Sequence, residues 1–406
     1  MPSPRDFILG PWRAVTVLGI TEVLSWGALF YPPVLTMPLI AADHGWSKAF
    51  AMGGFSVGLF VGGLVSRYVG ALIDRVGGHM VMPYGSLIGA GGLAGLVYAR
   101  SAYSYYAAWM VLGVAMAASL YDPAFATLGR IFGKNARAPI TTLTLAGGFA
   151  STVSWPATQF LIDHVGWRGT YLVYAVLLAL LAAPLHALAL PRGRAVEDAT
   201  ERPEQDRIAV PEPKGVPLLP AHGLAFVLVA AAFSAYAFVP SALSAQLLAV
   251  FERFGLPPAT VVAIGMLFGP AQVLARVGEL SFARHAHPLW IARAAVGLLV
   301  TAFALLMLLR FSAPLAACFA VMYGMANGLM TIARGTVPLS LFGAGGYGRL
   351  MGRIGGPFLV VQAVAPVCMS YVNDRASDRA GLVLAAAFAA AALLCFVAIR
   401  RPAAAA

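Results

Sequence analysis

The sequence predicts an all-α integral membrane protein with about twelve transmembrane helices, arranged as two pseudo-symmetric six-helix bundles. Its composition is the first observation: 60% of the 406 residues are hydrophobic and 11% are charged, against about 25% charged residues in soluble proteins. The mean hydropathy over the whole chain is +0.81, so the apolar composition is not confined to one segment. The other two observations are recurrent apolar runs of helical length and a repeat that relates the two halves.

Each apolar run has about 20 residues, the length of a helix that crosses a bilayer and longer than the strands of an outer-membrane barrel. The first run follows a short basic lead and contains Glu22. It is too long for the core of a signal peptide, so we interpret it as an uncleaved first span. Hydropathy and helical length predict spans at approximately 14–39, 49–73, 80–99, 104–131, 138–162, 168–190, 220–250, 258–282, 289–309, 314–341, 350–372 and 381–399.

One long hydrophilic segment, Arg192 to Pro217, separates the sixth span from the seventh. Its charged residues and prolines cannot bury a core, which is typical of a flexible linker. The predicted organisation is an N-terminal bundle at 1–191, a linker at 192–217 and a C-terminal bundle at 218–406. With both termini and the linker in the cytoplasm, 17 of the 27 Lys and Arg residues lie in cytoplasmic loops and 7 on the opposite side. This asymmetry follows the positive-inside rule.

The two halves repeat one pattern at an offset of about 209 residues. Arg67 recurs as Arg276, and Arg75 recurs as Arg284. The further matches are Pro32 with Pro240, Phe132-Gly133 with Phe342-Gly343, Gly147-Gly148 with Gly355-Gly356, and Pro156 with Pro366. A near-constant offset across five helices implies two halves of the same topology, related by an axis along the membrane normal.

The short polar stretch Arg67 to His79 joins the second span to the third, and it contains Gly70-x-x-x-Asp74-Arg75-x-Gly77. This pattern resembles the loop motif of the major facilitator superfamily, although Gly78-His79 stands where a basic pair is usual. Together with the repeat and the central linker, the resemblance covers nearly the whole chain. It implies a transporter whose halves rock around a site near the bilayer midplane.

A finer resemblance rests on His44-Gly-Trp46-Ser47, Tyr121-Asp-Pro123, the glycine-rich fifth span and Gly166-Trp167-Arg168. These segments are similar to bacterial relatives of the monocarboxylate transporters. The resemblance implies that Arg276, in the eighth span, holds the carboxylate of a substrate. Those relatives commonly place a lysine near the end of the first span, where this chain has Pro32-Pro33.

Charged residues within spans are costly and are therefore functional candidates. Glu22 could take up a proton once it is removed from water, and it could instead be capped by the hydroxyls of Thr21 and Ser25 while it orients helices. Asp122 is the second candidate for proton coupling. Because it precedes Pro123, it could also organise a helix break or pair with an arginine.

Arginines of the second half are the candidates for contact with the substrate. Arg276 and Glu279 lie one turn apart, so they could form a local ion pair; alternatively Arg276 binds an anion and Glu279 helps to hold a gate. Asn327, Thr331 and Arg334 form a polar stripe at helical spacing in the tenth span. This stripe is the best candidate for contact with the substrate, and it could instead serve helix packing. The side chains that could shape the pocket are Trp26, Tyr31, Phe149, Trp155, Gln159, Tyr236 and Gln246.

The predicted gating residues are Arg67, Asp74, Arg75, Glu279 and Arg284. An aspartate at the position of Asp74 can cap the N-terminus of a helix in the other half and lock one face of the protein closed. Because Arg276 is the repeat mate of Arg67, both could serve as gate arginines.

The chain shows no hydrolytic triad, phosphate loop or metal-ligand cluster, so we expect neither an enzyme nor an ATP-driven pump, and no cofactor or metal. The basic residues are scattered in short loops, which argues against nucleic acid. The predicted function is proton-coupled alternating-access transport of a small organic anion, by a monomeric unit in a bacterial-type inner membrane. The alternatives are efflux of a drug or of arsenite, for which Cys318, Cys368 and Cys395 could supply thiolates, and a non-transporting membrane sensor.

Overall fold

The computed structural model describes residues 10–192, 220, 223–244, 246–283, 286–308 and 311–400, and every regular element in these ranges is a helix. The first half contains α1 (Arg13–Leu29), α2 (Pro33–His44), α3 (Lys48–Val76), α4 (Gly78–Val97), α5 (Ala102–Ser119), α6 (Tyr121–Phe132), η1 (Gly133–Asn135), α7 (Arg137–Gly148), α8 (Ala150–Leu177), η2 (Leu178–Ala182) and η3 (Leu185–Ala189). The second half contains α10 (Leu224–Ser244), α11 (Leu247–Arg253), α12 (Pro258–Gly265), α13 (Phe268–Gly278), η5 (Glu279–Ala283), α14 (Pro288–Leu308), α15 (Ala313–Phe342), α16 (Tyr347–Arg375) and α17 (Asp378–Ala398).

Eleven described helical stretches are long and apolar enough to cross a membrane, and one of them, Arg137–Ala189, makes two crossings. Within it the backbone turns at Gly166, whose φ is 68°. The hydroxyls of Thr158 and Tyr174 share a 2.6 Å hydrogen bond, whereas residues 16 apart in a straight helix lie about 24 Å apart. The chain therefore doubles back at Gly166, and the twelve predicted crossings are confirmed.

Several crossings are broken near their middle. Residues 30–32 separate α1 from α2, Leu120 separates α5 from α6, and Phe149 separates α7 from α8. The break at Leu120 interrupts the single span predicted at 104–131, and it lies just before Asp122-Pro123, where the sequence allowed a helix break. It puts Asp122 in the first turn of α6, where the partial positive charge of a helix N-terminus favours a carboxylate.

The connection between α3 and α4 is shorter than the polar stretch suggested. Helix α3 continues through Asp74 and Arg75 to Val76, and α4 begins at Gly78. Gly77 alone lies between them, with a φ of 91° that a residue with a Cβ would rarely adopt.

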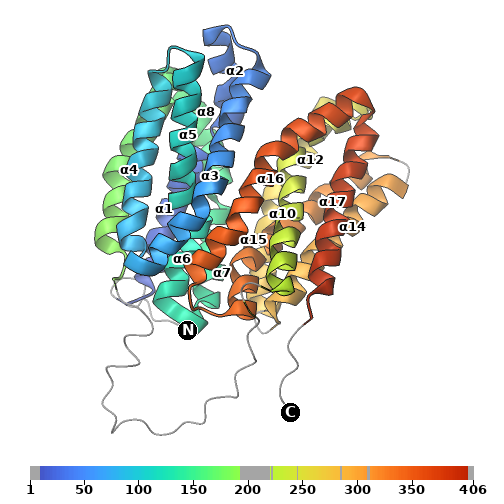
Figure 1. The fold of residues 1–406 in the computed structure, drawn as a ribbon. Helices are drawn as coiled ribbons and strands as arrows, with labels where there is room; N and C mark the ends of the chain where they lie inside the picture. Colours follow the sequence, from blue (N-terminus) through green and yellow to red (C-terminus); the bar gives the residue numbers. More distant parts are fainter. Residues whose placement is uncertain are drawn as a thin grey trace, which may run out of the picture.

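Figure 1 shows the two bundles, with helices α1 to α8 in blue to green and helices α10 to α17 in yellow to red. Helix α1 begins and α17 ends at the same end of the molecule, which we call the terminal end; the other end is the distal end. The bundles lean together at the terminal end and spread apart toward the distal end (Figure 1). The predicted linker at 192–217 lies outside the described residues except for Arg192, so the domain boundaries stay predictions.

Glycines bring the two halves into close contact where α3 packs along α16. A Cβ on Gly63 would lie 2.8 Å from the carbonyl oxygen of Gly356, and one on Gly70 would collide with the carbonyl of Gly348. Small residues allow such backbone approach between helices in lipid. A large apolar core continues the contact across both halves, joining Leu18 and Phe125 to Met351.

Candidate functional site

Arg276, on α13, is a buried cation without a matching anion. Only 3% of its surface is exposed, and in the described part of the chain no carboxylate forms an ion pair with it. Its guanidinium reaches Thr331 Oγ1 at 3.4 Å, and Gln272 Oε1 and the Gly328 carbonyl at 3.5 Å, which are long hydrogen bonds. Its Nη1 has no hydrogen-bond partner. A buried charge left in this state is costly, and a bound anion would relieve that cost.

Arg276 points across the boundary between the halves. A Cβ on Gly148, at the end of α7, would collide with its Nη1, so the glycine leaves room for the guanidinium. Tyr31 and Tyr121, both from the first half, also lie within electrostatic reach of Arg276. The broken crossings of the first half thus surround the arginine of the second half.

The three residues of the polar stripe on α15 contact different partners. Asn327 accepts a 2.9 Å hydrogen bond from the Tyr236 hydroxyl, and Thr331 contacts Arg276. Both therefore belong to the surroundings of Arg276. Arg334, one turn further along, turns instead toward the first half.

Arg334 and Asp122 form an ion pair between the halves. Arg334 Nη2 lies 2.6 Å from Asp122 Oδ2, and its guanidinium stacks over the ring of Phe358 at 3.4 Å from the centroid. Asp122 Oδ1 and Arg334 Nε have no hydrogen-bond partner. Asp122 balances the charge of Arg334, so this arginine links α6 to α15, whereas no described carboxylate balances the charge of Arg276.

Glu22, on α1, is fully buried, and only one of its two carboxylate oxygens has a hydrogen-bond partner. Its Oε2 accepts a 2.9 Å hydrogen bond from Trp26 Nε1, and its Oε1 has no partner. The ring of Trp26 packs against Tyr121 at 5.1 Å and against Tyr31 at 5.9 Å. Glu22 therefore belongs to the same aromatic cluster as the residues that face Arg276.

Neither hydroxyl that could have capped Glu22 does so. Ser25 Oγ has no hydrogen-bond partner, and Thr21 Oγ1 bonds to the carbonyl of Val17 at 3.0 Å. Thr21 Oγ1 also lies 2.8 Å from Nε2 of His186, whose Nδ1 lies 3.2 Å from Ser86 Oγ. Among the described side chains, Trp26 alone forms a hydrogen bond with Glu22.

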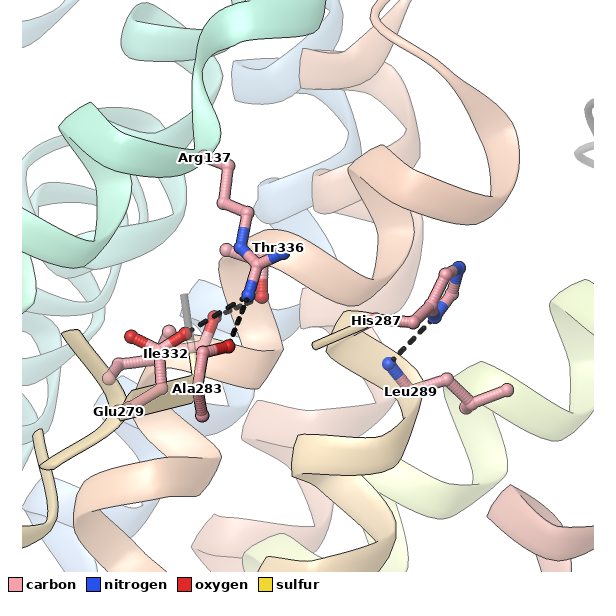
Figure 2. A network of polar contacts seen from close by, with 7 residues as sticks. All are labelled: Arg137, Glu279, Ala283, His287, Leu289, Ile332 and Thr336. Atoms are coloured by element: carbon pink, nitrogen blue, oxygen red, sulfur yellow. Dashed lines mark hydrogen bonds and ion pairs between the residues drawn. The ribbon is translucent and has the colours of Figure 1, made fainter. Parts of the chain in front are cut away.

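A second inter-half ion pair closes the terminal end. Arg137, at the start of α7, lies 3.2 Å from Glu279 Oε1 and donates to the carbonyl of Ala283 at 3.3 Å. Figure 2 shows Arg137 reaching to these two residues beside Thr336 of α15. Only 2% of the Glu279 side chain is exposed. Glu279 pairs with Arg137 and not with Arg276, so the local pair considered from the sequence does not form here.

Asp74 makes the contact expected from its loop. Its two carboxylate oxygens accept hydrogen bonds of 2.7 Å from the backbone N–H groups of Gly348 and Arg349, at the N-terminus of α16. A carboxylate in this position satisfies free N–H groups and interacts favourably with the helix dipole. Arg130 donates to the backbone carbonyl of Asp74.

The other predicted gating arginines lie apart from these contacts. Arg67 is exposed, and its guanidinium lies over the ring of its neighbour Tyr68 at 4.4 Å. Arg75 is exposed as well, and the described residues offer it no ion pair. Arg284 lies outside the described residues.

Sequence reasoning missed four residues of this arrangement. Arg137 was counted only as a loop cation, and Gln272, Tyr121 and His186 were given no role. His186 could have been found, because a histidine inside an apolar span is unusual. For Arg137 no local signal exists, since its partner Glu279 is 142 residues away.

Two helical bundles that meet at one end, with buried charges at their boundary, are the arrangement found in transporters of the alternating-access type. The sequence model of the Major Facilitator Superfamily matches residues 15–356. The chain belongs to that superfamily, as the loop and the repeat predicted. It is a multi-pass membrane protein and a transporter.

Relatives and solved structures agree with this assignment. The chain is 30% identical to mouse monocarboxylate transporter 11 over 151 residues, which are 37% of this chain and 32% of that protein. It is also 30% identical to the human protein of the same name over 156 residues, 37% of this chain and 30% of that protein. The chain thus spans about a third of the length of these curated relatives. The fold is similar to that of the human organic anion transporter MFSD10 (TETRAN), with a TM-score of 0.70, 16% identity, and coverage of 98% of this chain and 100% of the other.

Proposed function

We propose that this protein is a secondary active transporter that carries a small organic anion across a bacterial-type inner membrane, with proton coupling. The observation that carries the proposal is Arg276, a buried guanidinium at the boundary of the halves with no counter-charge and an unpartnered Nη1. A carboxylate has two coplanar acceptor oxygens, which match the paired N–H donors of a guanidinium. The names of the similar proteins, a monocarboxylate transporter and an organic anion transporter, support the same class of substrate.

The binding residues follow from what surrounds Arg276. Thr331 and Asn327 supply polar groups from α15, and Tyr31 and Trp26 supply aromatic walls from the first half. The anion enters from the distal end, where the bundles spread apart, and binds between them. Its charge cancels that of Arg276, so the halves can close around it at a lower electrostatic cost.

Glu22 is the proposed proton-coupling group. Its carboxylate is fully buried, has one oxygen without a partner, and lies in the aromatic cluster that faces Arg276. A proton on Glu22 removes a negative charge that would repel the entering anion. Asp122 is the second proposed proton-coupling group. Its protonation would weaken the ion pair with Arg334 that holds the halves together.

Gating at the terminal end is proposed for the Arg137–Glu279 pair and for the Asp74 cap on α16, with Arg67, Arg75 and Arg284 as further basic groups of that end. We place the terminal end in the cytoplasm, following the distribution of Lys and Arg. The transporting unit is proposed to be a monomer.

The test uses purified protein in proteoliposomes with an imposed pH gradient and a panel of radiolabelled organic carboxylates. We expect uptake of at least one carboxylate to rise with the gradient. Glu22→Gln, which keeps the acceptor for Trp26, should still exchange substrate across the membrane but lose the response to the gradient. Arg276→Gln should lose both activities, and Arg375→Gln, which removes an arginine at the distal end of α16, should lose neither.

Two results would contradict the proposal. One is carboxylate uptake by Arg276→Gln at the wild-type rate, which would remove Arg276 as the anion site. The other is an unchanged gradient response in both Glu22→Gln and Asp122→Asn, which would remove proton coupling through these groups.

Nothing in the described residues favours efflux of arsenite. Cys318, Cys368 and Cys395 are free thiols on three different helices, α15, α16 and α17. No group of three described His, Cys, Asp or Glu side chains could hold a metal ion.

A further inference from the structure

The distal end of the first half contains a basic groove that transport through the centre does not use. The groove has a volume of about 430 Å³, and its lining residues are His44, Val97, Tyr98, Ala99, Arg100 and Arg168. All of them belong to the first half, at the ends of α2 and α4 and after the turn at Gly166. Helix α4 lies at the outer edge of its bundle, on the side away from the second half (Figure 1). The groove is therefore separate from the site around Arg276.

Two segments that resemble the monocarboxylate transporter relatives build one wall of this groove. Arg168 Nη1 lies 2.5 Å from Asp43 Oδ2, and the guanidinium stacks over Trp167 at 4.5 Å. The ring of His44 stacks on Trp46 at 4.4 Å, with an angle of 15° between the planes. These contacts hold Arg168 in one orientation while leaving 48% of its side chain exposed. The ion pair with Asp43 uses only some of the five N–H donors of Arg168.

Arg100 supplies the excess positive charge of the groove. It is exposed, and among the described residues it has no ion-pair partner. Asp43 balances Arg168, so Arg100 leaves the groove with an uncompensated cation. The floor is apolar, because Val97 is 6% and Ala99 is 3% exposed. A basic rim over an apolar floor matches a ligand with an anionic head and an apolar body.

The groove continues into an apolar strip on the outer face of α4. Tyr84, Ile88, Gly91, Gly95 and Tyr98 follow one another at helical spacing and are exposed. A Cβ on Gly91 would have no atom within 4 Å, and one on Gly95 would lie 3.7 Å from Ala108 Cβ, so the two glycines leave the helix surface bare between the larger side chains. This strip lies within a predicted membrane span, and its last residue, Tyr98, also lines the groove.

We propose that this groove is a binding site for an anionic phospholipid of the leaflet at the distal end. The phosphate lies between Arg100 and Arg168, and an acyl chain follows the strip past Gly95 and Gly91. Arginines near a membrane surface attract anionic headgroups, and a guanidinium fork suits a phosphate oxygen pair. The bound lipid links the ends of α2, α4 and the crossing that begins at Trp167, and so stabilises the first half.

The test measures the thermal unfolding midpoint of the purified full-length protein in two kinds of vesicle. One contains phosphatidylcholine alone, and the other contains equal parts of phosphatidylcholine and phosphatidylglycerol. We expect phosphatidylglycerol to raise the Tm by about 2–4 °C. Arg100→Gln has no ion pair to lose, so it should fold normally while losing at least half of this shift, and adding Arg168→Gln should abolish the remainder.

Two further variants separate the parts of the proposal. Gly91→Leu places a side chain on the bare helix surface without changing the charge. It should reduce the phosphatidylglycerol shift while leaving the Tm in phosphatidylcholine unchanged. Arg375→Gln removes an arginine from the distal end of the second half, and it should keep the full shift. Inorganic phosphate and glycerol 1-phosphate, added to phosphatidylcholine vesicles, test whether a soluble anion is sufficient.

Three outcomes would overturn the proposal. The first is a full phosphatidylglycerol shift in Arg100→Gln/Arg168→Gln, and the second is an equal loss of the shift in Arg375→Gln. The third is stabilisation by the soluble phosphates that matches that of the lipid, which would assign the groove to a free anion. None of these outcomes depends on whether the protein carries organic anions.

Discussion

At the scale of single residues, the surroundings of a charge decide its role. Arg276 and Arg334 are both largely buried arginines of the second half, yet Arg334 has a carboxylate at 2.6 Å and Arg276 has none. A paired charge is neutralised and holds two elements together, whereas an unpaired one gains free energy from an anionic ligand. The polar stripe of α15 therefore supplies a link through Arg334 and, through Thr331, part of the proposed binding site.

Gly148→Ala tests whether the position of Arg276 matters for binding. The new Cβ would overlap Nη1, which lies at the end of a flexible side chain and can move away with little loss of stability. The guanidinium would then be displaced from its binding geometry, at the cost of about one charge-assisted hydrogen bond. We expect the KM for the anion to rise roughly 10-fold or more, measured by proteoliposome uptake.

The matched control for this change is Gly297→Ala on α14, where a Cβ would have no atom within 4 Å. It should leave both the KM and the Tm unchanged. An unchanged KM in Gly148→Ala would mean that the anion does not bind at Nη1 of Arg276.

Asp122→Asn tests the buried link between the halves. The change leaves Arg334 without its counter-charge, and breaking a buried pair in this way costs about 3–5 kcal/mol. Arg334→Met in the same chain removes the stranded charge and should recover most of the stability. The measurement is a double-mutant cycle by thermal unfolding in detergent. Additive losses would show that the two side chains are not coupled.

At the scale of elements, glycines and helix breaks determine where the halves touch. Helix α3 meets α16 through Gly63, Gly70, Gly348 and Gly356, whose backbones approach closely because no Cβ intervenes. The breaks at Leu120 and Phe149 allow Asp122 and Gly148 to point into the boundary between the bundles. Helices α3 and α16 thus provide the closest backbone contact, while the broken helices α6 and α7 bring polar groups to the boundary.

Gly70→Ala should force α3 and α16 apart at the terminal end. The new Cβ would collide with the backbone carbonyl of Gly348, which cannot turn away as a side chain can. Spin labels at Lys134→Cys and Gly345→Cys, in a chain whose three cysteines are replaced by serine, report the distance between the halves at this end. We expect the distance distribution to shift to longer values.

Gly278→Ala on α13 is the control, because its Cβ would have no atom within 4 Å. It should reproduce the distances of the parent chain. If Gly70→Ala also reproduced them, the glycine contact would not be what closes the terminal end.

At the scale of the whole molecule, the structure is a transporter closed at its terminal end and spread at its distal end (Figure 1). Two contacts join the halves at the terminal end, the Arg137–Glu279 pair and the cap of Asp74 on α16. In the proposed alternating access these contacts break when the halves rock. Their strength would then set the balance between the two end states.

Exchanging the charges of Arg137 and Glu279 tests this balance. Arg137→Glu alone puts two carboxylates together, which should open the terminal end and lengthen the Lys134–Gly345 distance defined above. Every change of about 1.4 kcal/mol alters the ratio of the two states tenfold. Adding Glu279→Arg restores an ion pair and should return the distances toward those of the parent chain. A double variant as open as the single one would contradict a specific pair.

The sequence alone was sufficient for the family, the number of crossings and the relation between the halves. Crossing number follows from the length of apolar runs, because a helix needs about 20 residues to span the hydrocarbon core. The loop pattern around Gly70 and Asp74 was also sufficient to predict that Asp74 caps a helix of the other half. These properties depend on local composition or on a repeat, and both can be read along one chain.

Only the tertiary structure decided which charges are paired. Arg334 and Asp122 are 212 residues apart, and Arg137 and Glu279 are 142 apart, so no spacing rule connects them. The sequence favours the polar stripe with Arg334 as the substrate contact, and Arg276 is a candidate through the resemblance to the monocarboxylate transporters, but neither argument shows which arginine has a counter-charge. Packing of the two bundles brought a carboxylate to Arg334 and a glycine to Arg276. Ion pairs act over a few ångströms, so the side chain that remains unpaired is determined only once the halves meet.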